Sequence, residues 1–198
     1  MNANLILMLY IIPLLLGILL ISPLREKLPI DGLIKKYPSL ENDTRKIFLG
    51  QTLIVLTGFA VSAHTLWISN KISEGGSYCS AQNIFDCDSV IGDMRYNTVP
   101  FTDVPWGLLG FLAFTVLLYF VRTLANEPHA QFVEKHIQFG KLMTIGGFFI
   151  IALLVYYEIK MGKICQYCTT AHAANIAAFF GFNEIEKAYK SDAWRKLN

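Results

Sequence analysis

Four cysteines carry the chemistry that this chain could perform, because a pair of thiols can take up and pass on two electrons. Cys79 and Cys87 lie in the one long polar segment between two apolar stretches. Cys165 and Cys168 form a Cys-x-x-Cys at the start of the last apolar stretch, and their spacing puts them on one face of a helix. One pair in a loop and a second pair at a membrane surface predict a two-electron relay from a soluble protein to a lipid-soluble carrier.

The Cys-x-x-Cys pair has a physical reason to react. The amino end of a helix carries partial positive charge and free amide donors, which stabilise a thiolate, and Lys163 stands two residues before Cys165. The thiolate is the attacking species in disulfide exchange. Cys165, Cys168 and His172 share one helical stripe, so they could present a thiolate and an imidazole to a ring bound between helices.

Other interpretations of the cysteines remain open from the residues alone. Cys79 and Cys87 could form a static structural disulfide in an exposed loop. Zinc ribbons usually pair two Cys-x-x-Cys knuckles, whereas here the other pair is spaced by seven residues, so we expect no metal site. Buried cysteines also serve as small apolar side chains, which would explain one of the last pair but hardly both.

The composition predicts the elements that must position these thiols. The chain is 54% hydrophobic and 16% charged, against about 45–50% and 25% in soluble domains. Five apolar stretches approach the length of about 17–25 residues that a spanning helix needs. We therefore expect an all-α membrane protein, a four-helix transmembrane bundle plus one extra N-terminal transmembrane helix. The five stretches are Leu5–Ile21, Ile47–Ser69, Trp106–Ala125, Phe139–Tyr157 and Ile164–Phe182.

These stretches divide the chain into three expected parts. Residues 1–46 would form the N-terminal transmembrane helix and a cytoplasmic connection, and residues 183–198 a cytoplasmic tail. Residues 47–182 would form the bundle, with an outer cysteine loop over residues 70–105. The first stretch lacks the leading positive charges of a secretory signal, so we expect it to be a retained helix.

The distribution of positive charge predicts the orientation. Thirteen of the 17 lysines and arginines fall in the segments on one side of the predicted spans. The positive-inside rule places that side in the cytoplasm, with the C-terminus, and both cysteine pairs outside. The outside is oxidising, so disulfides persist there. A net charge of +2 without a basic patch gives no sign of a nucleic-acid partner.

The arrangement resembles the vitamin K epoxide reductase family, including its bacterial members, over about residues 48–182. The disulfide bond formation protein B family also joins four helices, a quinone and two cysteine pairs, but carries Cys-x-x-Cys in its first outer loop. The order here is the reverse. The resemblance rests on Leu56-Thr57-Gly58 and Ser62, on Cys79-x7-Cys87-Asp88-Ser89-Val90, on Val104-Pro105 with Leu108-Leu109-Gly110, and on the run from Cys165 to Asn175.

The resemblance implies an electron relay. Cys79 would exchange with a reduced thioredoxin-fold partner, and Cys87 would attack the disulfide of the last helix at Cys165. Cys168 would face a quinone, ubiquinone or menaquinone, and pass electrons to it. About sixteen residues follow the last span, so we expect the partner to act in trans. The activity would be that of a quinone-dependent thiol oxidoreductase of the cytoplasmic (inner) membrane, which supports disulfide bond formation.

Three further residues are candidates for quinone contact. Asp93 stands where the family usually has a hydroxyl residue, and it could bond a ring oxygen if protonated. His172 stands where some relatives carry tyrosine, and an imidazole can donate a hydrogen bond and supply a proton. His64 could reach the same depth as Cys168, although a histidine packed between helices explains it better.

Three polar residues have structural interpretations. We expect Trp106 to be an interfacial anchor and Asn175 to join two helices by hydrogen bonding. Glu158 should stand near the outer surface, either solvated or paired with Lys160 or Lys163.

Two alternative functions remain. The first is reduction of vitamin K epoxide or quinone in an endoplasmic reticulum membrane, with the same direction of electron flow. The second is a non-enzymatic membrane scaffold whose loop is closed by a structural disulfide.

Overall fold

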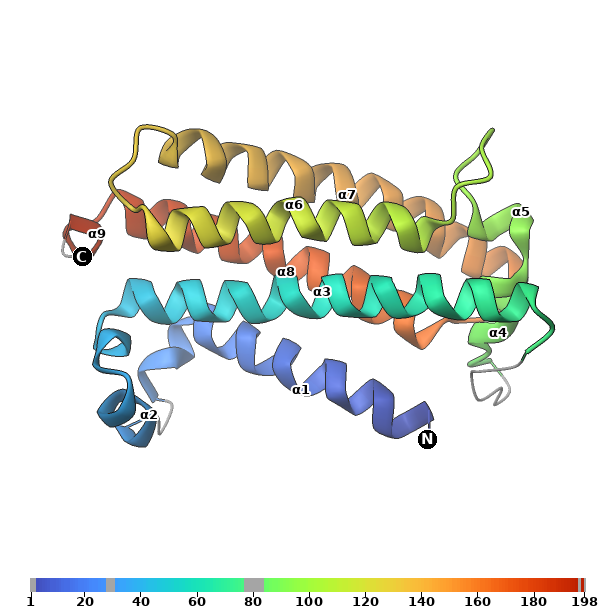
Figure 1. Ribbon diagram of the computed structural model, residues 1–198, viewed down its shortest axis with the longest axis horizontal. Helices are drawn as coiled ribbons and strands as arrows, with labels where there is room; N and C mark the ends of the chain where they lie inside the picture. Colours follow the sequence, from blue (N-terminus) through green and yellow to red (C-terminus); the bar gives the residue numbers. More distant parts are fainter. Residues whose placement is uncertain (1–2, 28–30, 77–83, 196, 198) are drawn as a thin grey trace.

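The computed structural model describes residues 3–27, 31–76, 84–195 and 197. The described chain is helical and contains no strand within those residues, which confirms the all-α prediction (Figure 1). Five helices are long: α1 (Ala3–Ile21), α3 (Asp43–Ser73), α6 (Trp106–Asn126), α7 (Val133–Met161) and α8 (Gln166–Tyr189). The short elements are η1 (Pro23–Lys27), α2 (Asp31–Lys36), η2 (Pro38–Glu41), α4 (Cys87–Gly92), α5 (Met94–Asn97) and α9 (Asp192–Arg195).

Among the described residues, three helices are long and apolar enough to cross a membrane: α3, α6 and α7. At about 1.5 Å per residue, the 31 residues of α3 exceed the hydrocarbon thickness of about 30 Å, so α3 extends beyond it. The apolar part of α1, Leu5–Ile21, is shorter, and α8 carries more polar residues. That α1 and α8 also cross the membrane stays a prediction.

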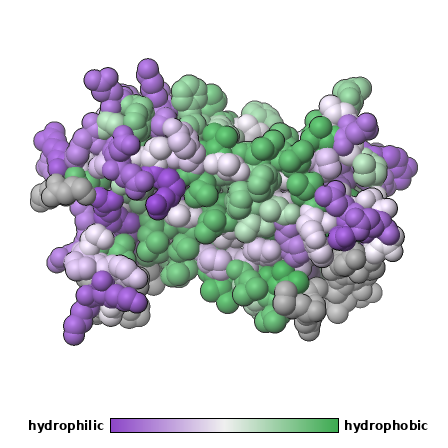
Figure 2. Space-filling view, viewed as in Figure 1, coloured by the Kyte–Doolittle hydropathy of each residue, from purple (hydrophilic) through white to green (hydrophobic). Residues whose placement is uncertain are grey.

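The surface has the pattern of a membrane protein. Figure 2 shows hydrophobic groups across the middle of one face of the molecule and hydrophilic groups at both ends of that face. Large apolar side chains of α7 also face outward, such as Phe149 at 76% exposure and Leu142 at 62%. Contiguous apolar surface of this kind is unfavourable in water, and contact with lipid accounts for it.

The helix α3 lies at the centre of the bundle. It packs against α1, α6 and α8, and α7 packs against α8 and α6 (Figure 1). Two glycines allow α1 to approach α3 closely, because a Cβ atom on Gly17 would stand 2.8 Å from the carbonyl oxygen of Gly50. The extra N-terminal helix is therefore packed tightly against the bundle.

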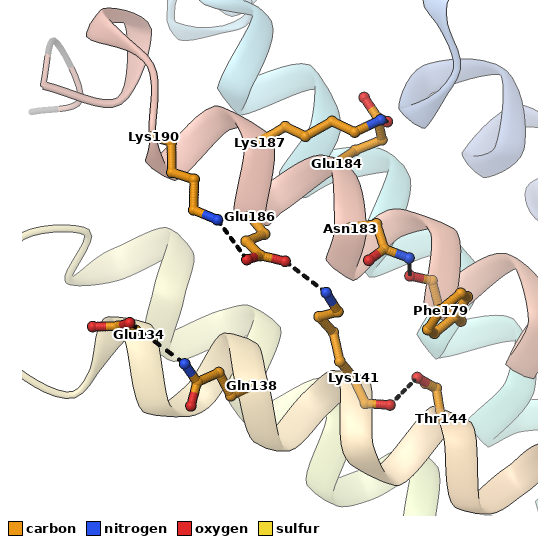
Figure 3. A network of polar contacts seen from close by, with 10 residues as sticks. All are labelled: Glu134, Gln138, Lys141, Thr144, Phe179, Asn183, Glu184, Glu186, Lys187 and Lys190. Carbon is orange, nitrogen blue, oxygen red and sulfur yellow. Dashed lines mark hydrogen bonds and ion pairs between the residues drawn. The ribbon is translucent and has the colours of Figure 1, made fainter.

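The two ends of the bundle carry different groups. The short helices α4 and α5 gather at one end, near the turn between α7 and α8, whereas α2, α9 and the C-terminus lie at the other (Figure 1). At the C-terminal end, Glu186 of α8 pairs with Lys141 of α7 at 2.6 Å and with Lys190 at 2.8 Å (Figure 3). Which end faces the cytoplasm stays a prediction.

Candidate active site

A tight turn brings α7 back into α8 as an antiparallel neighbour. The helix α7 ends at Met161, and Gly162 adopts a left-handed conformation with φ of +63°, which suits glycine. The N–H of Lys163 then donates to the carbonyl oxygen of Glu158 at 3.2 Å. Only Ile164 separates this turn from Cys165, which caps the amino end of α8.

The segment that precedes α4 is joined to this turn by backbone hydrogen bonds. Phe85 and Ile164 form a parallel β-bridge. The N–H of Asp86 donates to the carbonyl oxygen of Ile164 at 3.2 Å. The N–H of Ile164 donates to the carbonyl oxygen of Ile84 at 2.9 Å. The sequence suggested that the charge of Lys163 acts on the thiols. In the structure, Nζ of Lys163 lies 3.3 Å from the carboxylate of Asp86, so this charge also faces Asp86.

Asp86 also starts the helix that carries Cys87. Its carboxylate accepts hydrogen bonds from the backbone N–H of Ser89 at 3.0 Å and from the Ser89 hydroxyl at 2.6 Å. These two bonds, with a smaller contribution from Lys163, hold the pKa of Asp86 below its usual range. Cys87 follows as the first residue of α4 and is 3% exposed.

Three of the four predicted redox cysteines meet in the described part of the chain. Cys165 is completely buried, and its sulfur accepts a hydrogen bond from the N–H of Cys168 at 3.2 Å. Cys87, Cys165 and Cys168 lie in one buried cluster, and the thiols of Cys87 and Cys168 are both near enough to act on the Cys165 thiol. Cys165 thus has both the loop cysteine and its own Cys-x-x-Cys partner as neighbours. Cys79 lies outside the described residues.

A cavity of about 140 Å³ opens beside Cys168. It lies among α3, α6, α7 and α8, and residues of α4 and α5 contribute to its wall. Of the three described cysteines, Cys168 lines this cavity, whereas Cys87 and Cys165 do not. Most of the other lining side chains are apolar, and the polar ones are Ser62, Thr65, Tyr96, Asn97, Trp106, Tyr157, Glu158, His172 and Asn175.

Two residues of the cavity wall carry a buried nitrogen atom that has no hydrogen-bond partner among the described residues. They are Nε1 of Trp106 and Nε2 of His172. An unpaired buried polar group costs about 1–3 kcal/mol, so such a group in a cavity wall points to a ligand that pairs with it. Trp106, which the sequence suggested as an interfacial anchor, thus also lines the cavity.

Glu158 is the site residue that sequence reasoning missed. It is 9% exposed rather than solvated, and its Oε1 accepts a hydrogen bond from the N–H of Cys165 at 3.0 Å. It also lines the cavity together with Cys168. A carboxylate seven residues before the Cys-x-x-Cys, at the end of a predicted span, was the available signal.

Asp93 and His64 do not line the cavity. Asp93 caps α5, and its carboxylate accepts hydrogen bonds from Arg95, at 2.7 Å from Nη2, which hold the pKa of Asp93 below its usual range. A carboxylate held in its ionised form does not donate to a ring oxygen. His64 instead lies 3.0 Å through Nδ1 from the hydroxyl of Tyr10 in α1.

Asn175 joins two helices, as predicted. Its side-chain amide donates to the carbonyl oxygen of Thr144 in α7 at 3.0 Å. Gly147 makes room for this contact, because a Cβ atom there would stand 2.5 Å from Oδ1 of Asn175. The bond fixes α8 against α7 at the depth of the cavity that both helices line.

The model of the vitamin K epoxide reductase family matches residues 51–181, about two thirds of the chain. The chain belongs to this family. Neither a search of curated proteins nor a search of solved structures found a match. Membership identifies the protein, in general terms, as a membrane oxidoreductase of thiols and quinones.

Proposed function

We propose that the protein is a quinone-dependent thiol oxidoreductase of the cytoplasmic membrane that supports disulfide bond formation. It takes electrons from a thioredoxin-fold partner in trans. The observation that carries the proposal is the position of Cys165, which is buried and has both Cys87 and Cys168 as neighbours, while Cys168 lines a cavity. This order matches the order of a relay from the loop to the cavity.

The proposed steps are thiol–disulfide exchanges in which electrons and atoms balance. A partner thiolate attacks the Cys79–Cys87 disulfide at Cys79, and completion of that exchange leaves both loop thiols reduced. Cys87 then attacks Cys165 in the Cys165–Cys168 disulfide, which forms a mixed disulfide and releases Cys168. Cys79 resolves this mixed disulfide by attacking Cys87, so the loop disulfide re-forms and Cys165 and Cys168 are both reduced.

The cavity supports a quinone as the final acceptor. A cavity of about 150 Å³ holds a benzene ring, and the cavity here measures about 140 Å³. In an otherwise mostly apolar wall, His172 and Trp106 supply nitrogen atoms that can pair with ring carbonyl oxygens. A bound quinone would accept two electrons and two protons. Cys168 would deliver the electrons, because it lines the same cavity.

The proposed topology has five membrane-spanning helices, with α1 and α8 crossing beside α3, α6 and α7. Both cysteine pairs would face the periplasm or the extracellular space, and the C-terminus would lie in the cytoplasm. The lysine-rich end around Glu186 and the opposite end with Cys87 support this orientation under the positive-inside rule (Figure 3).

Differential thiol labelling tests the proposal. The purified protein is reduced, freed of reductant, and alkylated before and after addition of a quinone in detergent. We expect quinone to protect Cys165 and Cys168 from alkylation, because they form a disulfide, and Cys168→Ser to abolish this protection. Labelling that is the same with and without quinone would contradict the proposal and favour a scaffold with an inert disulfide.

A second experiment identifies the electron donor. Cys87→Ala removes the thiol that resolves the exchange at Cys79, so a mixed disulfide with the partner should accumulate. We expect the captured protein to have a thioredoxin fold, and the adduct to disappear in the Cys79→Ser/Cys87→Ala variant. Capture through Cys79 of proteins that lack a redox-active dithiol would contradict this part of the proposal.

A further inference from the structure

The chemistry of the site requires a path for protons as well as for electrons. When Cys165 and Cys168 form a disulfide, the two thiols give up two protons, and a quinone needs two protons to become a quinol. Cys165 is completely buried, so its proton passes first to a protein group and not to bulk water. A group suited to this role must contact the Cys-x-x-Cys segment and also line the cavity.

Glu158 meets both requirements. Its Oε1 accepts a hydrogen bond at 3.0 Å from the N–H of Cys165, and its side chain lines the cavity together with Cys168 and His172. It comes from α7, whereas the cysteines come from α8, so the carboxylate reaches the Cys-x-x-Cys from the facing helix. At 9% exposure it is shielded from solvent, and Cys87 lies within electrostatic range of it.

We propose that Glu158 is the proton-transfer group between the Cys165–Cys168 pair and the cavity, an inference that rests on the proposed function. The carboxylate accepts a proton from the dithiol as the S–S bond forms. It then gives that proton to an oxygen atom of the quinone that receives the two electrons. The second proton reaches the quinone through His172, whose Nε2 is buried in the same wall without a described partner.

The other titratable groups near Glu158 are few, within the described residues. The walls contributed by α3 and α6 contain no titratable side chain. Lys163 and Asp86 are paired with each other at 3.3 Å. The groups that share the cavity with Glu158 or act on it electrostatically are Tyr96 of α5, Tyr157 of α7, Cys168 and His172 of α8, and Cys87 of α4.

Glu158→Gln separates the proton-transfer role from a structural one. Glutamine keeps an oxygen atom that can accept the hydrogen bond from the N–H of Cys165, but it cannot take up a proton. Single-turnover oxidation of the reduced protein by quinone should slow by about 10²-fold, the lower range for general acid–base catalysis. Glu134→Gln is the matched control, since Glu134 lies at the other end of α7 and contacts Gln138 (Figure 3).

The pH profile provides the readout that a structural role would not change. We expect the wild-type rate to fall as the pH is lowered far enough to protonate Glu158, and the Glu158→Gln rate to lack this fall. Glu158→Asp, which keeps a carboxylate, should recover part of the rate and the fall at low pH. An unchanged rate and an unchanged profile in Glu158→Gln would overturn the inference.

A measurement without quinone covers the case in which the variants alter quinone binding. The alkylation rate of Cys168 in the reduced protein should depend on pH differently in the wild type and in Glu158→Gln, because the charge of Glu158 is removed in the variant. The same dependence on pH in both proteins would overturn the inference. If the wild-type protein itself fails to reduce quinone, the proposed function fails, and the alkylation profile still tests Glu158 alone.

Discussion

The N–H of Asp86 donates to the carbonyl oxygen of Ile164 at 3.2 Å, so the residue before Cys87 is bonded to the residue before Cys165. Two cysteines that lie 78 positions apart in the chain are thereby brought to the same place by backbone atoms. Backbone hydrogen bonds hold a position with little dependence on side-chain rotamers. The proposed exchange between the loop and the last helix would therefore start from a prearranged pair of thiols.

The charge of Asp86 should make the loop that carries Cys87 sensitive to acid. The pKa of Asp86 is lowered in the folded protein by the hydrogen bonds from Ser89 and by Lys163. A carboxyl group of this kind stabilises the fold above its unfolded pKa of about 4, and this contribution is lost as the pH falls through the lower folded value. We expect the thermal midpoint in detergent to fall more steeply on acidification from pH 5 to pH 3 in the wild type than in Asp86→Asn.

The helix-capping role of Asp86 gives a second comparison at neutral pH. Asparagine caps a helix about as well as aspartate, whereas alanine does not, at a cost of about 1 kcal/mol. Asp86→Ala should therefore be less stable than Asp86→Asn. Asp103→Asn, an exposed change in the same loop, serves as control. Equal acid sensitivity in the wild type and Asp86→Asn would show that this carboxylate does not hold the loop.

Close packing between α1 and α3 should make Gly17 intolerant of a side chain. A Cβ atom there would stand 2.7 Å from Cγ1 of Ile54 and 2.8 Å from the carbonyl oxygen of Gly50, and overpacking of this kind costs about 1–3 kcal/mol. Gly146 in α7 has no atom within 4 Å of the same position. In a helix interior, alanine is otherwise favoured over glycine by about 1 kcal/mol.

Gly17→Ala and Gly146→Ala form a matched pair for this prediction. We expect the thermal midpoint in detergent to fall for Gly17→Ala and to stay equal or rise for Gly146→Ala. If both variants move in the same direction by similar amounts, α1 is not held tightly against α3.

The cavity nitrogens should set the affinity for quinone. Trp106→Phe and His172→Leu each place an apolar side chain at the position and remove a buried nitrogen atom of the wall. A hydrogen bond contributes about 0.5–1.5 kcal/mol, so each change should raise the quinone KM by about 2- to 10-fold. Steady-state kinetics with varied quinone measures this. Trp67→Phe is the control, because Trp67 is 46% exposed and lies outside the cavity. Unchanged kinetics in both cavity variants would remove these residues from the quinone site.

Much of this site could be predicted from the sequence. The long apolar stretches predicted the long helices. The Cys-x-x-Cys spacing predicted a helix start, and Cys165 is indeed the residue that caps α8. These features depend on local spacing, which a sequence displays directly.

The missed features depend on contacts between distant segments. From the sequence, Glu158 is expected to be an exposed residue at a helix end. In the structure, the turn at Gly162 brings the N–H of Cys165 back to the carboxylate of Glu158. His64 lies at a suitable depth for the cavity, but its side of α3 is covered by α1, where Tyr10 bonds it. Depth along a helix follows from counting residues, whereas direction around it depends on which neighbours pack there.

The most direct test of the relay is a disulfide between Cys87 and Cys165. The chain has four cysteines, so the Cys79→Ser/Cys168→Ser variant contains only Cys87 and Cys165. Under mild oxidation, we predict that the two thiols of the monomer join, and that mass spectrometry of a proteolytic digest finds the peptides of Cys87 and Cys165 linked. If both thiols remain free to alkylation under conditions that oxidise the wild-type Cys165–Cys168 pair, the proposed relay is contradicted.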